Sequence, residues 1–209
     1  TPLVFIVHTD TIEIEKFIPD YDKFLIEEIT DMKFISPSGH EFHLKKEQPF
    51  AYLLDRMKLI KSKRNDIKSS ISFENIQKII RTKDKIIIQT LENCYISSMI
   101  IGCDGAFSKV RESFGITHPK ISYGMIVRTK RKSENKNITV HVNKDYSSDF
   151  FAWNIPYKNE WGLMTSKNPR HCIEKFSNDK KFNLSGIISA PIPMGTTKSY
   201  SNNCLLIGD

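Results

Sequence analysis

The chain has 209 residues, of which 39% are hydrophobic and 26% are charged. This composition is typical of one large or two small globular domains, long enough to bury a core without disulfides or metals. No stretch reaches the roughly 18 consecutive apolar residues of a membrane-spanning helix, and we expect no secretory signal within these residues. Glycine occurs 9 times and never as Gly-x-Gly, which excludes a dinucleotide-binding glycine loop within these residues.

Lysine and arginine outnumber aspartate and glutamate by 31 to 24, giving a net charge of +7. Most of these cations are scattered lysines, whereas specific nucleic-acid readers favour clustered arginines. We therefore expect a solvated basic surface and no nucleic-acid partner. The net positive charge also suits a peripheral contact with an anionic membrane. The 4 cysteines contain no Cys-x-x-Cys pair, so the sequence predicts reduced thiols in a cytoplasmic protein and no metal site.

In the first half of the chain, β-rich runs alternate with polar breaks. The pattern predicts these elements in order: a strand over 3–7, a hairpin over 31–44, an apolar run over 52–56, a short helix over 57–69, an antiparallel meander over 76–80, 85–90 and 94–101, and a helix over 108–114.

The second half is again strand-rich from 121 to 193. Residues 138–142 alternate between apolar and polar, which indicates one buried face. Further predicted elements are a hairpin of 150–153 with 161–164, a short helix over 169–176 and a last buried strand over 203–207.

The most specific local pattern is Gly102-Cys-Asp104-Gly105, which follows an apolar run. A carboxylate at the C-terminal end of a strand lies where α/β sheets bind ligands. Gly105 allows the backbone to approach such a ligand closely, and Ser108 is a suitable N-cap for the next helix. The alternative is an ordinary strand-to-helix turn in which Arg111 is only a solvated charge.

A second Gly-Asp pair, Gly208-Asp209, also follows an apolar strand. Carboxylates at strand ends are fixed acceptors for the ribose or ribitol hydroxyls of a dinucleotide. His40-x-x-His43 lies on a predicted strand, where residues three apart face opposite sides, so a shared metal is not expected there.

The segment 100–111 resembles the Asp-Gly motif of the flavoprotein hydroxylase superfamily, and 205–209 is similar to the start of that superfamily's Gly-Asp motif. Leu54-Asp55-Arg56 resembles the segment whose arginine faces the flavin nucleotide. Within the superfamily, 151–156 (Phe-Ala-Trp-Asn-Ile-Pro) and 190–195 (Ala-Pro-Ile-Pro-Met-Gly) are similar to the geranylgeranyl reductase family. The resemblance covers 12–209.

Some features depart from that family. The glycine-rich strand-loop-helix that holds the FAD pyrophosphate in the family is not found in these residues. Phe151 and Ile155 stand where the family usually has tyrosine and phenylalanine. The sequence is therefore interpreted as an internal fragment, inactive by itself, and its alternative is a truncated remnant without catalytic function.

The resemblance implies a mixed α/β fold. Its parts are a partial Rossmann-like FAD-binding domain with a three-stranded meander (1–115), an interleaved antiparallel β-sheet substrate domain (116–197) and a return strand (198–209). The implied FAD contacts are Arg56, Ile76 through its backbone near the adenine, Asp104, Gly105, Gly208 and Asp209. The implied substrate contacts are Phe151, Trp153 and Pro156. Arg111 is expected to brace the Asp104 loop.

The implied activity is saturation of C=C bonds in isoprenoid lipid precursors by hydride transfer from reduced flavin. Its substrate would be a prenylated lipid or another small apolar molecule, and its electron donor a nicotinamide cofactor or a ferredoxin. The alternative within the superfamily is an FAD-dependent aromatic monooxygenase or halogenase. No residue is predicted as the proton donor.

Overall fold

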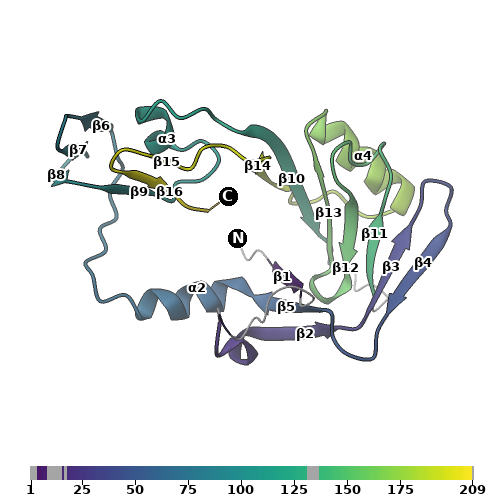
Figure 1. Ribbon diagram of the computed structural model, residues 1–209. Coiled ribbons are helices and arrows are strands. Elements are labelled where there is room, and N and C mark those ends of the chain that lie inside the picture. The colour runs from purple at the N-terminus through teal and green to yellow at the C-terminus, as the bar shows by residue number, and fades with distance from the viewer. Residues whose placement is uncertain (1–3, 9–15, 17, 131–136, 209) are drawn as a thin grey trace. The chain divides into compact units, whose positions relative to one another are not determined.

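The computed structural model describes residues 4–8, 16, 18–130 and 137–208 (Figure 1). The chain divides into two units, each assembled from separate stretches: Thr1–Ile71, Arg128–Lys144 and Phe151–Trp161 form unit 1, and Ser72–Val127, Asp145–Phe150 and Gly162–Asp209 form unit 2. Both units combine strands with a few helices, which confirms the predicted mixed fold class. Within the described residues, no helix is both long and apolar enough to cross a membrane.

Unit 1 contains a three-stranded antiparallel sheet in the order β1 (Val4–His8), β5 (Ala51–Asp55) and β2 (Leu25–Ile29), and the 3-10 helix η1 (Tyr21–Phe24) leads into β2. The helix α2 (Arg56–Asn65) follows β5 directly. It begins there because the Asp55 carboxylate accepts hydrogen bonds from the Met57 and Lys58 amides, both at 3.1 Å. A capping carboxylate satisfies amides that have no partner within the helix.

Four further strands of unit 1 lie in the order β12 (Ala152–Ile155), β11 (Ile138–His141), β3 (Asp31–Ile35) and β4 (Glu41–Lys45). The predicted 31–44 hairpin is confirmed, because β3 and β4 pair antiparallel from Asp31↔Lys45 to Ile35↔Glu41. β11 runs parallel to β3 and antiparallel to β12. The core cluster of this unit consists of Ile29, Phe50, Ala51, Leu53, Ile138 and Ile155.

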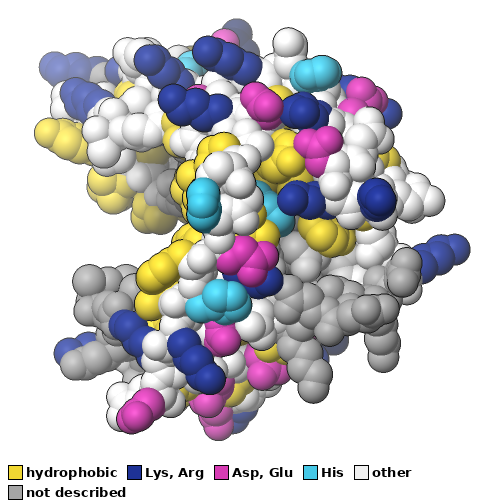
Figure 2. Space-filling model, turned by 90° about the vertical axis from the view of Figure 1, so that its right-hand side faces the viewer, with side chains coloured by type: hydrophobic (Ala, Val, Ile, Leu, Met, Phe, Trp, Pro, Cys, Tyr) yellow, Lys and Arg dark blue, Asp and Glu magenta, His cyan; other side chains and the backbone are white. Residues whose placement is uncertain are grey.

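The surface of the face drawn in Figure 2 carries lysine, arginine, aspartate and glutamate side chains interspersed with histidines. This mixture agrees with the scattered lysines of the sequence, since a sequence without cation clusters spreads its charge over many elements. The hairpin of β3 and β4 shows the same intermingling at close range, because the Lys33 ammonium lies 3.0 Å from the Glu41 carboxylate.

Unit 2 begins with the predicted meander, β6 (Lys78–Arg81), β7 (Ile86–Gln89) and β8 (Cys94–Ser97), all antiparallel. The prediction of one continuous third strand over 94–101 is wrong. The Ser97 side chain bonds the backbone of Met99, donating to its carbonyl at 2.6 Å and accepting from its amide at 3.2 Å. This local turn ends β8, and the chain enters a different sheet as β9 (Ile100–Gly102).

The segment before the meander is fastened by one carboxylate. Glu74 accepts hydrogen bonds from Thr90 Oγ1 at 2.5 Å and from Asn93 Nδ2 at 3.0 Å, and also from the hydroxyls of Ser72 and Tyr95. These hydrogen bonds, of which the one from Ser72 has the largest effect, lower the pKa of Glu74 to about 2. The carboxylate therefore ties the approach to β6 to the turn between β7 and β8.

The second sheet of unit 2 has the order β15 (Tyr200–Ser201), β16 (Cys204–Leu206) and β9, and β16 runs parallel to β9. Figure 1 draws the short helix α3 (Lys109–Ser113) beside this sheet. One face of the sheet packs against α3 through a core cluster of Ile86, Ile100, Val110, Phe114, Ile116 and Cys204. An added Cβ at Gly102 would lie 2.8 Å from both Leu206 Cδ2 and Val110 Cβ, so only glycine fits at the end of β9.

The rest of unit 2 contains β10 (Lys120–Arg128), of which all but Arg128 belongs to this unit, paired antiparallel with β14 (Ile188–Met194). The helix α4 (Pro169–Lys180) is longer than the predicted 169–176 helix and buries Ile173 and Phe176. The 3-10 helix η2 (Pro156–Lys158) of unit 1 separates β12 from β13 (Glu160–Thr165), at the predicted polar break, and β13 enters unit 2 at Gly162. The domain boundaries inferred from the sequence stay a prediction.

Candidate functional site

The Asp104 side chain lies in the loop between β9 and α3, as the sequence predicts. Its Oδ1 accepts a hydrogen bond from the Ser108 hydroxyl at 2.5 Å, and its Oδ2 accepts one from the Val110 amide at 3.2 Å. Burial acts to raise the pKa of this carboxyl, but the hydrogen bonds from Ser108 and from backbone amides outweigh it and lower the pKa below the usual 3.8. Asp104 is therefore an ionised acceptor at neutral pH.

Ser108 is the N-cap of α3, which confirms the sequence prediction. Its Oγ accepts a hydrogen bond from the Arg111 amide at 2.9 Å while its hydroxyl donates to Asp104. The helix ends at Ser113 with Phe114 as its C-cap, and Gly115 follows with φ of 62°. Ser108 is 4% exposed, whereas Asp104 is exposed, so a buried hydroxyl anchors a carboxylate that solvent can reach.

A pocket of about 310 Å³ opens within unit 2 beside this loop. Its walls come from the β9–α3 loop, from the chain between β14 and β15, and from the end of β16. The residues that line it are Gly102, Asp104, Gly105, Ser108, Arg111, Pro119, Pro193, Gly195, Thr196, Thr197, Ser199, Leu206, Ile207 and Gly208. The volume falls at the lower end of the range for small-molecule sites.

Three of the lining glycines have left-handed backbone conformations that favour glycine. Their φ angles are 80° at Gly105, 80° at Gly195 and 100° at Gly208. A Cβ added at any of them would meet no other atom within 4 Å, so the space above each backbone is open. Bare backbone beside an open pocket allows a ligand to approach the peptide groups closely.

The pocket brings together three of the predicted cofactor contacts: Asp104 and Gly105 from one strand end, and Gly208 from the other. The two strand ends meet because β16 pairs in parallel with β9, with Cys204 opposite Ile100. Asp209 lies outside the described residues. Ile76 is in unit 2 but does not line the pocket, and its carbonyl accepts a hydrogen bond from Lys109 Nζ at 2.7 Å.

The other predicted contacts belong to unit 1. Arg56 is the first residue of α2 and is half-buried. The rings of Phe151 and Trp153 meet edge to face with centroids 6.2 Å apart, and Trp153 packs against the core cluster of unit 1. Pro156 is the first residue of η2. Because the core contact of Trp153 accounts for part of its surface, the indole has a structural role besides any contact with a substrate.

The sequence prediction missed one wall of the pocket, the segment from Gly195 to Ser199. Thr196, Thr197 and Ser199 line it with hydroxyl groups. The available signal was a glycine at the end of a strand followed by small polar residues, a pattern that marks a loop but does not identify its neighbours.

Arg111 differs from the expectation, because its guanidinium bonds this missed segment instead of Asp104. Arg111 Nη1 donates to Thr197 Oγ1 at 3.1 Å and to the Lys198 carbonyl at 3.0 Å.

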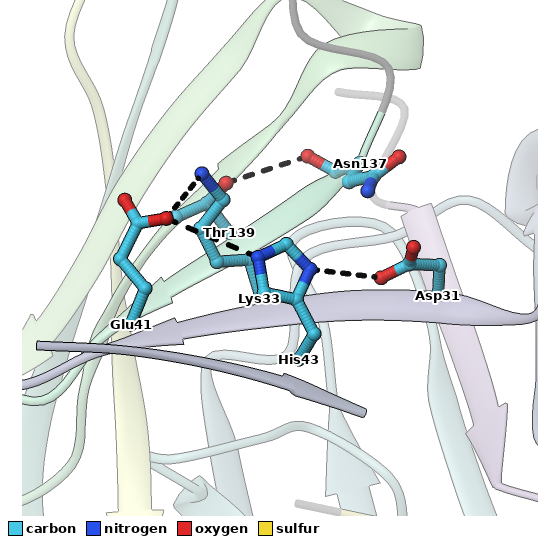
Figure 3. A network of polar contacts seen from close by, with 6 residues as sticks. All are labelled: Asp31, Lys33, Glu41, His43, Asn137 and Thr139. Atoms are coloured by element: carbon cyan, nitrogen blue, oxygen red, sulfur yellow. Dashed lines mark hydrogen bonds and ion pairs between the residues drawn. The ribbon is translucent and has the colours of Figure 1, made fainter. Parts of the chain in front are cut away.

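The two histidines of the His40-x-x-His43 pattern have separate partners in unit 1. His40 Nδ1 lies 2.8 Å from the Ser38 hydroxyl in the hairpin turn. His43 lies between two carboxylates, with Nδ1 3.6 Å from Asp31 Oδ1 and Nε2 3.9 Å from Glu41 Oε2 (Figure 3). Asp31 and Glu41 lie next to different ring nitrogens of His43. A metal ion bound to one of these nitrogens would therefore not be within reach of both carboxylates.

No protein-family model matches the chain, and no curated protein matches it in sequence. Solved structures match it in fold. A geranylgeranyl bacteriochlorophyll reductase-like protein from Thermoplasma acidophilum superposes with a TM-score of 0.76 at 15% identity, over 97% of this chain and 59% of that protein. A 2,6-dihydroxypyridine-3-hydroxylase from Arthrobacter nicotinovorans matches with a TM-score of 0.65 at 12% identity, over 100% and 67%.

Klebsiella pneumoniae HpxO, solved in complex with FAD and uric acid, gives a TM-score of 0.57 at 11% identity, over 100% of this chain and 64% of that protein. The chain therefore shares its fold with a reductase-like protein and with a hydroxylase, and it spans about three fifths of the Thermoplasma protein.

Proposed function

We propose that this chain is part of an FAD-dependent oxidoreductase and that its pocket binds part of the FAD. The observation that carries the proposal is the meeting of two strand-end motifs, Asp104-Gly105 and Gly208, on one pocket of about 310 Å³. Support comes from the fold, which is shared with a protein solved in complex with FAD. Ligands of open α/β sheets bind at the carboxyl ends of parallel strands.

The residues present fit such a group. The Asp104 carboxylate accepts hydrogen bonds from the Ser108 hydroxyl and the Val110 amide and is still exposed at the pocket, so it can also receive a hydroxyl of the cofactor. Gly105 and Gly208 leave the backbone accessible on two sides. Asp209, Arg56 and the Ile76 backbone are proposed as further contacts on the strength of the sequence resemblance.

For the reaction, we propose saturation of an isoprenoid C=C bond, with Phe151, Trp153 and Pro156 in contact with the apolar substrate. When bound and reduced, FAD supplies a hydride to one alkene carbon, and the second carbon must gain a proton. The apolar side chains would exclude water and orient the alkene. The fold likeness to the Thermoplasma reductase-like protein supports this assignment.

The second candidate is hydroxylation of a small aromatic compound. It is favoured by the likeness to a dihydroxypyridine hydroxylase and to a protein complexed with uric acid. The edge-to-face pair of Phe151 and Trp153 would offer an aromatic surface in either case.

The first experiment tests the cofactor. We expect the purified full-length protein, after incubation with FAD and removal of free flavin, to retain the visible absorption of bound flavin. Asp104→Asn should weaken FAD binding by about tenfold or more, the loss expected for one charged hydrogen-bond partner. Asp84→Asn is the matched control, because Asp84 lies in the exposed turn between β6 and β7. A protein that binds no FAD would refute the proposal and favour the non-catalytic remnant.

The second experiment separates the two reactions. The reduced enzyme is incubated anaerobically with a geranylgeranylated lipid, and separately with NADPH, oxygen and a hydroxypyridine. Mass spectrometry distinguishes a gain of hydrogen from a gain of oxygen. Hydrogenation of the lipid supports the reductase assignment, and oxygen insertion into the aromatic compound would replace it with the hydroxylase.

A further inference from the structure

The guanidinium of Arg111 joins two walls of the pocket that are far apart in sequence. Arg111 Nη1 donates to the Thr117 carbonyl at 3.1 Å, on its own side of the pocket. The same nitrogen donates to Thr197 Oγ1 and to the Lys198 carbonyl, 86 and 87 residues further along the chain. One guanidinium nitrogen carries two hydrogens, so these three acceptors share them in bifurcated bonds.

The wall that Arg111 reaches has little regular structure of its own. Residues 195–199 connect β14 to β15 and belong to neither a helix nor a strand. At one end the Ser199 carbonyl accepts a hydrogen bond from the Leu206 amide at 2.7 Å, and at the other end Gly195 turns the backbone with φ of 80°. The bonds from Arg111 therefore fall on the middle of the segment, where they hold it toward α3.

Arg111 itself is well anchored. Its amide is bound by Ser108 at 2.9 Å and its carbonyl accepts hydrogen bonds from the amides of Phe114 and Ile116 at 3.2 and 3.1 Å. Among the described residues, the side-chain hydrogen bonds of Arg111 all go to neutral oxygens, and no carboxylate there forms an ion pair with it. Its contribution to the site is therefore geometric: it links a fixed helix to an irregular segment.

We propose that Arg111 is a positioning residue, which holds the Gly195–Ser199 segment as the second wall of the pocket and so sets the pocket's width for its ligand. That this ligand is FAD rests on the proposed function, but the positioning of the segment by Arg111 does not depend on it. All three bonds start from Nη1, and the nitrogen of a lysine would lie one bond closer to the backbone, so a lysine at this position would keep the charge but fall short of these acceptors.

The test compares two arginines of the same region. In Arg111→Met, hydrogen–deuterium exchange of the full-length protein without ligand should speed up in peptides covering 195–201. Arg81→Met is the matched control: Arg81 Nη1 donates to the Ser113 carbonyl of α3 at 3.3 Å and its guanidinium lies 4.4 Å from the Phe114 ring centroid. It should leave the exchange of 195–201 unchanged.

Binding provides the second readout. Arg111→Met should weaken FAD binding by about tenfold and shift the absorption of the bound flavin, since a loosened wall changes its surroundings. Arg111→Lys should resemble Arg111→Met, whereas a purely electrostatic role would let Arg111→Lys resemble the wild type and would overturn the proposal.

A milder variant covers the case in which Arg111→Met does not fold. Thr197→Val removes one acceptor, and it should increase exchange in 195–201 to a smaller extent. Equal exchange of this segment in wild type, Thr197→Val and the Arg111 variants that fold would overturn the proposal. If the wild type binds no FAD but the exchange still responds to Arg111, the cofactor assignment fails and the positioning role stands.

Discussion

The packing at the end of β9 gives a sharp prediction about stability. In Gly102→Ala, the new Cβ would lie 2.8 Å from Leu206 Cδ2 and 2.8 Å from Val110 Cβ, and 3.0 Å from Val110 Cγ1. Carbon atoms in contact are normally about 3.5–4.0 Å apart. The Leu206 methyl can rotate away, but Val110 is a β-branched residue, 3% exposed, and its Cβ moves only if α3 moves.

The magnitude follows from two opposing terms. Overpacking a buried site costs about 1–3 kcal/mol, and replacing glycine by alanine recovers about 0.4–1 kcal/mol through the unfolded chain. We therefore expect Gly102→Ala to lower the free energy of unfolding by about 1–2 kcal/mol, which is about 2–8 °C in Tm for a chain of this size. The displacement of α3 would also move Asp104, because its partners Ser108 and Val110 both belong to the start of that helix.

The assay is urea denaturation followed by far-ultraviolet circular dichroism. Tryptophan fluorescence would report on the wrong part of the protein, because Trp153 and Trp161 both belong to unit 1. The control is Gly124→Ala, where the added Cβ would lie 2.7 Å from Ile192 Cδ1, the mobile tip of a side chain, and no other atom within 3.5 Å. Gly124→Ala should therefore change stability by less than about 0.5 kcal/mol. Equal stability of the two variants would refute the packing argument.

Three further predictions concern charged and capping groups. Because the pKa of Glu74 is lowered from 4.5 to about 2, its carboxylate stabilises the fold at pH values above 4.5, and this contribution is lost as the pH falls toward about 2. The acid unfolding of Glu74→Gln should lack this pH dependence. Arg128→Met removes a partner 3.4 Å from the buried Glu160 carboxylate, and calorimetry should show a loss of about 2 kcal/mol or more. Ser108→Ala should cost about 1 kcal/mol in urea unfolding and raise the pKa of Asp104, which NMR titration would detect.

The sequence predicted local structure well where the signal is local. The 31–44 hairpin, the meander and the N-cap at Ser108 are each specified by turn residues or capping residues a few positions away. The division of 94–101 into two strands was not predictable from the same kind of pattern, because the whole run is β-rich. What draws β9 away from β8 is its pairing with β16, about a hundred residues further along the chain.

The pocket shows the same limit. Asp104, Gly105 and Gly208 were found because each is part of a motif with its own spacing. Thr196, Thr197 and Ser199 belong to an irregular segment, and only the fold determines what such a segment faces. The partners of Arg111 were missed for the same reason, since its acceptors at 197 and 198 are brought to it by the return of the chain to β15 and β16.

The hydrogen bonds of Asp104 also bear on whether the Asp-Gly motif is a functional site or only a turn. Ser108 alone would be enough to cap α3, yet its hydroxyl also donates a hydrogen bond to Asp104 Oδ1. The other oxygen, Oδ2, accepts a hydrogen bond from the Val110 amide, which has no partner within the first turn of the helix. The carboxylate therefore has a structural role in the turn. A loss of FAD binding in Asp104→Ala would not show whether a cofactor contact or the turn itself had been lost.

Asp104→Asn does distinguish them. The amide oxygen of asparagine can still accept from Val110, and its NH₂ group can donate to the Ser108 oxygen, so the start of the helix keeps its hydrogen bonds while the charge is lost. If the motif is only a turn, Asp104→Asn should bind FAD as the wild type does. If the carboxylate receives a cofactor hydroxyl, binding should weaken in Asp104→Asn with little change in stability, because the variant alters the acceptor without altering the loop that presents it.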